Sequence, residues 1–111
     1  MSSQEYSVDR KKLAKRPPIH PRVIFAEEVM PELRKDRTIA QIAELLNVSR
    51  ATLHRVMAGD IAISVDMAVR LGKLCGNGPD LWLNLQKRYD LHQAQQELGA
   101  KIKDIPTLEV A

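Results

Sequence analysis

The amino-acid sequence predicts an all-α fold of about five helices with an extended last helix. Apolar residues recur three and four positions apart along most of the chain, and no segment alternates apolar and polar residues as a strand does. Ser or Thr precedes most of these periodic runs and Gly or Asn follows them, as at helix ends. With 111 residues, of which 44% are hydrophobic and only 4% aromatic, the chain is expected to form one domain with an aliphatic core.

The chain divides into three parts. Residues 1–18 are polar and charged and end in two prolines, so we expect a flexible basic arm. Residues 1–22 hold six basic and two acidic residues, a net charge of +4, whereas the whole chain carries +3. Such an arm is either a solvated tail or a segment that contacts DNA phosphates or a partner. Residues 19–98 form the expected folded domain and residues 99–111 a C-terminal tail.

The first helix is expected to start at Pro21, since proline is favoured in the first turn of a helix. Its apolar positions are Val23, Ile24, Phe25, Val29 and Leu33. Pro31 lacks the N–H that an interior helical residue donates, and its ring crowds the preceding turn. We therefore expect this helix to end or kink near Val29.

A second and a third helix are expected on either side of Asn47, which tolerates the left-handed conformation of a tight turn. Thr38 is placed to cap the second helix and Ser49 the third, which Gly59 ends. The expected buried residues of this pair are Ile39, Ile42, Ala43, Leu45, Leu46, Val48, Leu53 and Val56.

Two further helices are expected. Ser64 caps the fourth, and Pro79 and Asp80 open a fifth that extends to Leu98. The apolar face of the fourth helix consists of Val65, Met67, Ala68, Leu71, Leu74 and Cys75. The fifth carries two apolar stripes, one of Leu81, Trp82, Leu85 and Tyr89 and another of Leu83, Leu91, Ala94 and Leu98.

The domain itself can cover only one of these two stripes, and an exposed apolar face usually marks an interface. We therefore expect the fifth helix to join two copies of the chain. The predicted dimer interface comprises Leu83, Tyr89, Leu91, Ala94 and Leu98. The alternative is that the second stripe receives the tail at residues 99–111.

Residues 38–59 have the spacing of a helix-turn-helix. Ala43 is the small residue where the first helix packs on the second, Asn47 follows four positions later at the turn, and Ser49 caps the second helix. A plain amphipathic hairpin has no need of these three residue types at these separations. The sequence therefore predicts a motif that places a helix in the major groove of DNA.

Because Leu53 and Val56 face the core, the other side of the 50–58 helix is available to base edges. Arginine pairs with guanine, and small apolar groups contact the thymine methyl group. The predicted base-reading residues are Arg50, Ala51, Thr52, His54 and Arg55. The residues predicted to hold the DNA backbone are Lys35, Arg37, Thr38, Gln41 and Ser49.

Other chemistry is not indicated. His20, His54 and His92 lie far apart, and neither a phosphate-binding loop nor a nucleophile motif occurs, so we expect no catalysis, metal or cofactor. Cys75 is the only cysteine, which excludes an internal disulfide and points to a reducing compartment, and its thiol is expected to be buried and inert. With no membrane span and no secretory leader in this sequence, the protein is expected in the cytoplasm.

Four stretches resemble one protein family: PPIHP at 17–21, NVSRATLHRVMAG at 47–59, SVDMAVRLGKLCG at 64–76 and PDLWLNLQKRYDL at 79–91. The last two are the most specific. Together they are similar to the Xre-type, lambda-repressor-like regulators of the HigA (VapI-like) antitoxin group. The sequence departs from the family pattern at three positions, because Arg22 and Asn47 replace glycines and Ile39 replaces a glutamine.

The resemblance implies a non-catalytic dimer that binds a palindromic operator and represses its own operon. It also implies neutralisation of a co-encoded HigB-type toxin, a RelE-like ribonuclease that cleaves mRNA. Two alternatives stay open: a stand-alone Xre repressor without a toxin, and an interaction module that masks a toxin and in which DNA binding is secondary. A toxin would contact either the arm or the tail. Ile39 cannot replace the family's phosphate-binding glutamine, so Thr38, Gln41 or the loop at 34–37 would supply that contact.

Overall fold

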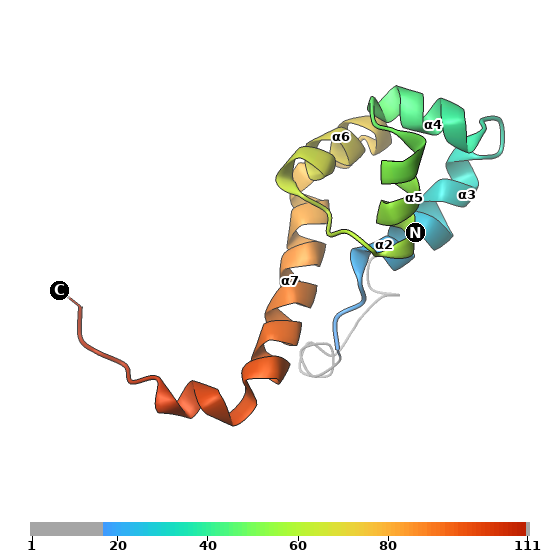
Figure 1. The fold of residues 1–111 in the computed structure, drawn as a ribbon. Helices are drawn as coiled ribbons and strands as arrows, with labels where there is room; N and C mark the ends of the chain where they lie inside the picture. Colours follow the sequence, from blue (N-terminus) through green and yellow to red (C-terminus); the bar gives the residue numbers. More distant parts are fainter. Residues whose placement is uncertain (1–16, 111) are drawn as a thin grey trace, which may run out of the picture.

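The structure, a computed structural model, describes residues 17–110, and every regular element in that range is helical (Figure 1). The elements are α2 (Pro21–Ile24), η2 (Phe25–Val29), α3 (Met30–Leu33), α4 (Ile39–Leu46), α5 (Arg50–Ala58), α6 (Val65–Cys75), α7 (Pro79–Leu98) and η3 (Gly99–Asp104). This confirms the all-α prediction and the boundaries expected for the last four helices. Apart from Pro17 and Pro18, the expected basic arm lies outside the described residues.

The first helix continues past the point where we expected its end. α2, η2 and α3 follow one another without a break, so the helix runs to Leu33. η2 is a π-helical turn, in which the Met30 N–H donates to the Phe25 carbonyl five residues earlier. Pro31 has no N–H to donate, and a wider turn directly before it gives its ring room. The distortion expected near Val29 is therefore a π-turn within one helix.

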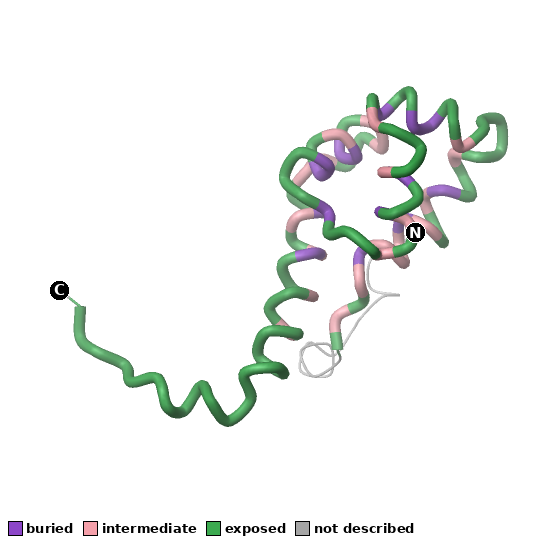
Figure 2. Tube along the Cα trace, in the orientation of Figure 1, coloured by how far each residue is buried: buried purple, intermediate pink, exposed green. Residues whose placement is uncertain are grey.

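The core lies where the first helix, α4, α5, α6 and the first half of α7 meet (Figure 2). Its largest side chains are Trp82 and Phe25, whose ring planes are perpendicular at a centroid distance of 6.0 Å. Met30 is also fully buried, although we did not predict it as a core residue. The π-turn shifts the helical phase, which is why a simple 3.6-residue pattern misses it.

Three expected core positions are exposed. Leu45 is 57% accessible, Val65 is 67% accessible, and Leu81 also faces outward. On the short α4 helix, the buried face has room for Ile42, Ala43 and Leu46 only. Neighbouring helical residues differ by 100° in direction, so Leu45 points away from the core although Leu46 points into it.

A glycine lets α6 and the start of α7 pack closely, and a buried glutamine bonds α7 to the loop before α6. A Cβ on Gly72 would lie 2.3 Å from the Gly78 carbonyl carbon, so only glycine fits there. The buried Gln86 accepts a hydrogen bond from the Ile63 N–H at 2.8 Å and donates to Asp90 at 3.0 Å. These contacts fix α7 against the loop that precedes α6.

The second half of α7 projects from the domain and carries η3 and the tail away from it (Figure 1). The radius of gyration is 17.5 Å, whereas a compact chain of this length has about 13 Å. All residues from Gln93 to Val110 are exposed. The chain therefore presents a long helical arm that its own core does not cover.

Candidate nucleic-acid interface

The turn between α4 and α5 has the local geometry that a helix-turn-helix needs. Asn47 adopts φ 56° and ψ 46°, the only positive φ of a non-glycine residue in the described range. The Val48 N–H donates to the Ala43 carbonyl at 3.0 Å and the Asn47 N–H to the Glu44 carbonyl at 2.9 Å. This two-bond pattern ends a helix and redirects the chain. The sequence prediction for Asn47 is thereby confirmed.

Arg70 on α6 holds this turn from outside the motif. Its Nη1 donates to the Leu46 carbonyl at 2.9 Å and to the Asn47 carbonyl at 3.2 Å. Asp66, one helical turn earlier, accepts from Arg70 Nε, and this hydrogen bond lowers the pKa of the Asp66 carboxyl. Sequence reasoning missed Arg70. The spacing of Asp66 and Arg70 indicates an ion pair on α6, but it does not indicate the turn that Arg70 reaches.

Arg22 fixes the other end of α5. Its side chain lies across Gly59, where an added Cβ would be 2.7 Å from the Arg22 Cδ. Arg22 Nη1 is 3.5 Å from the Met57 carbonyl, at the helix end where a cation is favourable. Arg22 thus joins the first helix to the end of α5.

The outward face of α5 carries four of the predicted base-reading residues, all of them exposed: Arg50, Ala51, His54 and Arg55. Leu53 and Val56 are buried on the opposite face, as expected. α5 contains no acidic residue. Its outward face therefore combines two guanidinium groups with the partial positive charge of a helix N-terminus, an arrangement suited to DNA.

The fifth predicted base-reading residue, Thr52, has its polar group engaged within α5. Its hydroxyl accepts a hydrogen bond from the Ser49 hydroxyl at 2.9 Å, and its N–H donates to Ser49 Oγ at 3.0 Å. Ser49 is therefore the N-cap of α5, as the sequence predicts. Thr52 is half-buried and keeps both its methyl group and the hydrogen of its hydroxyl, which only accepts here.

Thr38 and Gln41 form a reciprocal cap at the start of α4. The Gln41 N–H donates to Thr38 Oγ1 at 3.1 Å, and the Thr38 N–H donates to Gln41 Oε1 at 2.8 Å. Because the backbone N–H is a donor, the amide oxygen must face it, which leaves the Gln41 Nε2 hydrogens directed away from the cap. Ile39, between them, is half-buried against the core.

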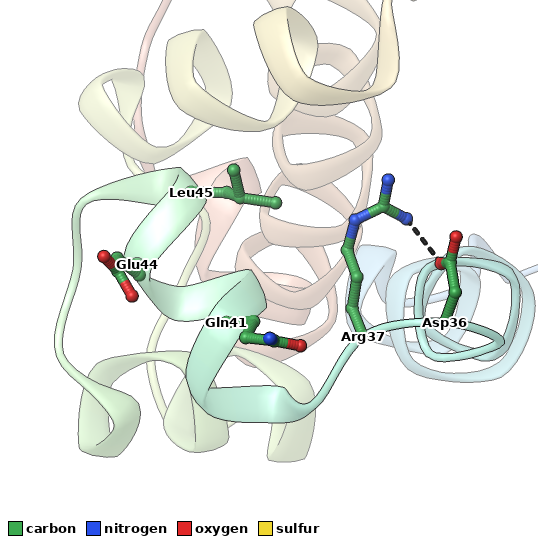
Figure 3. A pocket seen from close by; sticks show the side chains of 5 residues that line it. All are labelled: Asp36, Arg37, Gln41, Glu44 and Leu45. Atoms are coloured by element: carbon green, nitrogen blue, oxygen red, sulfur yellow. Dashed lines mark hydrogen bonds and ion pairs between the residues drawn. The ribbon is translucent and has the colours of Figure 1, made fainter.

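Lys35 and Arg37 lie in the loop before α4 and are paired with acidic neighbours. Lys35 Nζ is 2.9 Å from Glu32, and Arg37 Nη1 is 2.8 Å from Asp36. Both pairs are exposed, so each contributes little to stability and can exchange its partner for a phosphate. Figure 3 shows the hollow of about 580 Å³ beside them, lined by Asp36, Arg37, Gln41, Glu44 and Leu45.

The residues predicted for the dimer interface differ in exposure. Leu91, Ala94 and Leu98 are exposed along the projecting part of α7, whereas Leu83 and Tyr89 are half-buried. The Tyr89 ring packs edge-on against His20 at a centroid distance of 4.6 Å. Part of the Tyr89 ring is therefore already covered within its own chain.

His20 joins the start of the first helix to α7. Its Nδ1 accepts a hydrogen bond from the Arg22 N–H at 3.0 Å, so His20 is the N-cap of α2. Partial burial and the Arg22 cation lower the pKa of His20, against a weaker opposing effect of Asp90. The neutral ring is the form that can accept this hydrogen bond. On α6, the half-buried position of Cys75 raises the pKa of its thiol.

Two capped helices joined by a left-handed turn, with a cationic second helix facing outward, define a helix-turn-helix DNA-binding protein. Comparison with known proteins leads to the same class of protein. The family described as a helix-turn-helix domain matches residues 32–84. Among residues 17–110, no helix is both long and apolar enough to cross a membrane.

Relatives and solved structures place the chain more narrowly. Virulence-associated protein I of Dichelobacter nodosus is 32% identical over 73% of each chain. A HigA-family antidote protein from Coxiella burnetii shares 34% identity and a TM-score of 0.72, covering 85% of this chain and all of the other. The antitoxin HigA of Pseudomonas aeruginosa, solved with the higBA promoter, shares 34% identity and a TM-score of 0.72, covering 86% and 100%.

The chain belongs to the Xre-type helix-turn-helix family that includes the HigA antitoxins. It spans between 57% and 81% of the length of several curated relatives. This is a family of regulators and antitoxins and not of enzymes, in agreement with the sequence prediction.

Proposed function

We propose that the protein is a cytoplasmic antitoxin that binds a palindromic operator as a dimer, represses its own operon and neutralises a HigB-type toxin that cleaves mRNA. The observation that carries the DNA-binding part is the acid-free, outward face of α5, with Arg70 bonded to the turn before it and Arg22 to its C-terminal end. Three solved structures support it: Pseudomonas aeruginosa HigA was solved with the higBA promoter, PA4674 of the same organism with its operator, and antitoxin GraA with its operator.

In this proposal α5 enters the major groove and its exposed side chains meet base edges. Arg50 and Arg55 donate to guanine, and His54 donates or accepts. Ala51 and the Thr52 methyl group contact thymine methyl groups. The Thr52 hydroxyl accepts from Ser49 and keeps its own hydrogen, so it can also donate to a base or a phosphate.

The backbone contacts come from the start of α4 and the loop before it. The Gln41 amide nitrogen and the Thr38 hydroxyl each retain a hydrogen that their reciprocal cap does not use. Lys35 and Arg37 exchange their exposed acidic neighbours for phosphates. The N-terminus of α5, capped by Ser49, adds backbone amides. In this way the chain does without the polar residue that Ile39 replaces.

A palindromic operator requires two reading helices about 34 Å apart, one helical turn of DNA. A twofold dimer through α7 supplies them, with the exposed Leu91, Ala94 and Leu98 at its centre and Leu83 and Tyr89 at its edge. The apolar residues that are exposed in the single chain would then be buried in the dimer.

The toxin partner is proposed from the family alone. A stand-alone repressor is the second candidate, because YbaQ of Escherichia coli, 35% identical over 79% of this chain, is named only as a transcriptional regulator. A neighbouring reading frame that encodes a small basic protein would favour the antitoxin over the stand-alone repressor. Co-purification of that protein with this chain would establish the antitoxin. If no such protein exists, the repressor remains.

The DNA-binding proposal is tested by gel shift with DNA from upstream of the protein's own gene. Arg50→Ala and Arg55→Ala should each weaken binding by about 5- to 150-fold, corresponding to about 1–3 kcal/mol, and relax preference at one base pair. Lys73→Ala is the matched control, since it removes one exposed charge from α6, outside the site. Equal affinity of both arginine variants and the native protein would contradict the assignment.

A further inference from the structure

Between α6 and α7 lies an apolar groove that residues 17–110 leave open. The groove encloses about 560 Å³ between the start of α6 and the middle of α7. Its apolar wall consists of Ile63, Val65, Leu83 and Leu91, and Lys87 and Asp90 stand at its polar edge. Val65 and Leu91 are 67% and 55% exposed, which is unusual for aliphatic side chains that lie side by side around a hollow.

The C-terminal end of the described chain carries an exposed apolar segment. After Gly99, η3 and the extended residues that follow carry Ile102, Ile105, Leu108 and Val110, all exposed. The segment leads away from the domain (Figure 1). Four aliphatic residues within nine positions are a poor composition for a solvated tail, because such tails are low in aliphatic residues.

The stripe on α7 determines where the tail begins in a dimer. A twofold axis perpendicular to α7 that passes near Leu91 makes the two α7 helices antiparallel and places Leu91 opposite its own copy. Leu98 of one subunit then lies opposite Leu83 of the other, since both are about equally far from Leu91. The tail of each subunit therefore starts beside the groove of its partner.

Within one chain the geometry is less favourable. Leu83 and Leu98 are 15 residues apart on one helix, so about 22 Å separate them along its axis. The tail would have to reverse direction at Gly99 and run back over that length to reach its own groove. In the structure the chain bends at the end of α7, and the tail runs to the side, clear of the domain (Figure 1).

We propose that the C-terminal segment from Gly99 to Val110 packs into the α6–α7 groove of a second copy of this chain. The two subunits then exchange their C-terminal segments, and the aliphatic residues of each segment cover Val65 and Leu83 of the other subunit. The inference rests on the dimer proposed above and adds to it a second contact outside the α7 pair.

Disulfide trapping tests the exchange of tails directly. Cys75→Ser removes the native thiol, and two single-cysteine chains, Val65→Cys and Ile105→Cys, are then mixed and oxidised. A covalent heterodimer is expected, because a disulfide forms only where two Cα atoms come within about 7 Å. Lys73→Cys replaces Val65→Cys in the matched control and should give no cross-link. A chain carrying both cysteines that closes on itself as a monomer would overturn the proposal.

Removal of residues 99–111 tests the contribution of the tail. Analytical ultracentrifugation should show a dimer whose dissociation constant rises at least tenfold on truncation, and a similar rise for Ile105→Asp with Leu108→Asp. Lys103→Ser, a polar change in the same segment, should leave it unchanged. If the full chain dimerises and truncation has no effect, the tail inference is wrong and the proposed dimer stands. If the full chain is monomeric at all concentrations, the proposed dimer itself is wrong.

Discussion

Arg70 and Asn47 are 23 residues apart in the sequence and meet at the helix-turn-helix turn, where Arg70 Nη1 donates to the Asn47 carbonyl at 3.2 Å. The bond passes from α6 to the end of α4, so it joins the reading motif to the rest of the domain. The carbonyls at a helix end lack partners within the helix. A guanidinium group there satisfies two of them and fixes the direction of α5.

Arg70→Ala should therefore lower the melting temperature and weaken operator binding, although Arg70 lies on α6, outside the helix-turn-helix motif. Arg70→Lys should recover only part of the loss, because a single ammonium group does not reproduce the planar fork of donors. Thermal unfolding and gel shift measure the two effects. Lys73→Ala, on the same helix, is the control, and an equal effect of that change would mean that only charge matters.

The left-handed Asn47 gives a second prediction. Asn47→Val should destabilise the protein by about 1–2 kcal/mol, since a β-branched side chain clashes in this conformation. Asn47→Gly should leave the free energy of unfolding unchanged or slightly higher. Urea denaturation distinguishes them. Equal stability of the two variants would show that the turn can adopt another conformation.

Gln86 is the only buried polar side chain in the described range, and its removal should be costly. Gln86→Leu leaves the Ile63 N–H buried without an acceptor, for an expected loss of about 1–3 kcal/mol in the free energy of unfolding. Asp90→Asn keeps an acceptor for the Gln86 amide, so it should have little effect. A Gln86→Leu variant as stable as the native protein in urea would contradict the proposed role.

The lowered pKa of His20 leads us to expect that the stability of the protein depends on pH. Burial and Arg22 lower its folded-state pKa below the ordinary value of 6.5. Stability is therefore complete above pH 6.5 and falls as the pH drops through the folded-state pKa, because protonated Nδ1 cannot accept from the Arg22 N–H. His20→Asn supplies a cap that does not titrate and should flatten this part of the profile. An unchanged slope between pH 7 and pH 5 would assign the effect to other groups.

The local features of the fold could be predicted from the sequence because they depend on neighbouring residues. Thr38, Ser49 and Ser64 cap their helices as expected, and Asn47 forms the expected turn. Contacts between distant residues could not be predicted. Arg70 bonds to a carbonyl 24 residues away and Arg22 to one 35 residues away, and no local pattern indicates which carbonyl a cation will reach.

The exposure of the proposed base-reading residues on α5 could be predicted from the sequence, but their hydrogen-bond partners could not. Once Leu53 is assigned to the core, helical periodicity gives the residues of α5 that are exposed. The engagement of Thr52 by Ser49, however, depends on a side-chain rotamer. The exposure of Leu45 and Val65 depends on how many residues a short helix can bury, which periodicity alone does not give.

The reciprocal cap between Thr38 and Gln41 has a consequence for the thermodynamics of recognition. A glutamine side chain loses considerable rotamer freedom when it is immobilised. In this chain the amide of Gln41 is already immobilised before any ligand arrives, at 2.8 Å from the Thr38 N–H. The entropy of ordering it belongs to folding and not to complex formation. In the proposed complex, a phosphate that meets α4 would find a donor that the cap has already ordered, so less of the affinity gained there would be offset by side-chain ordering.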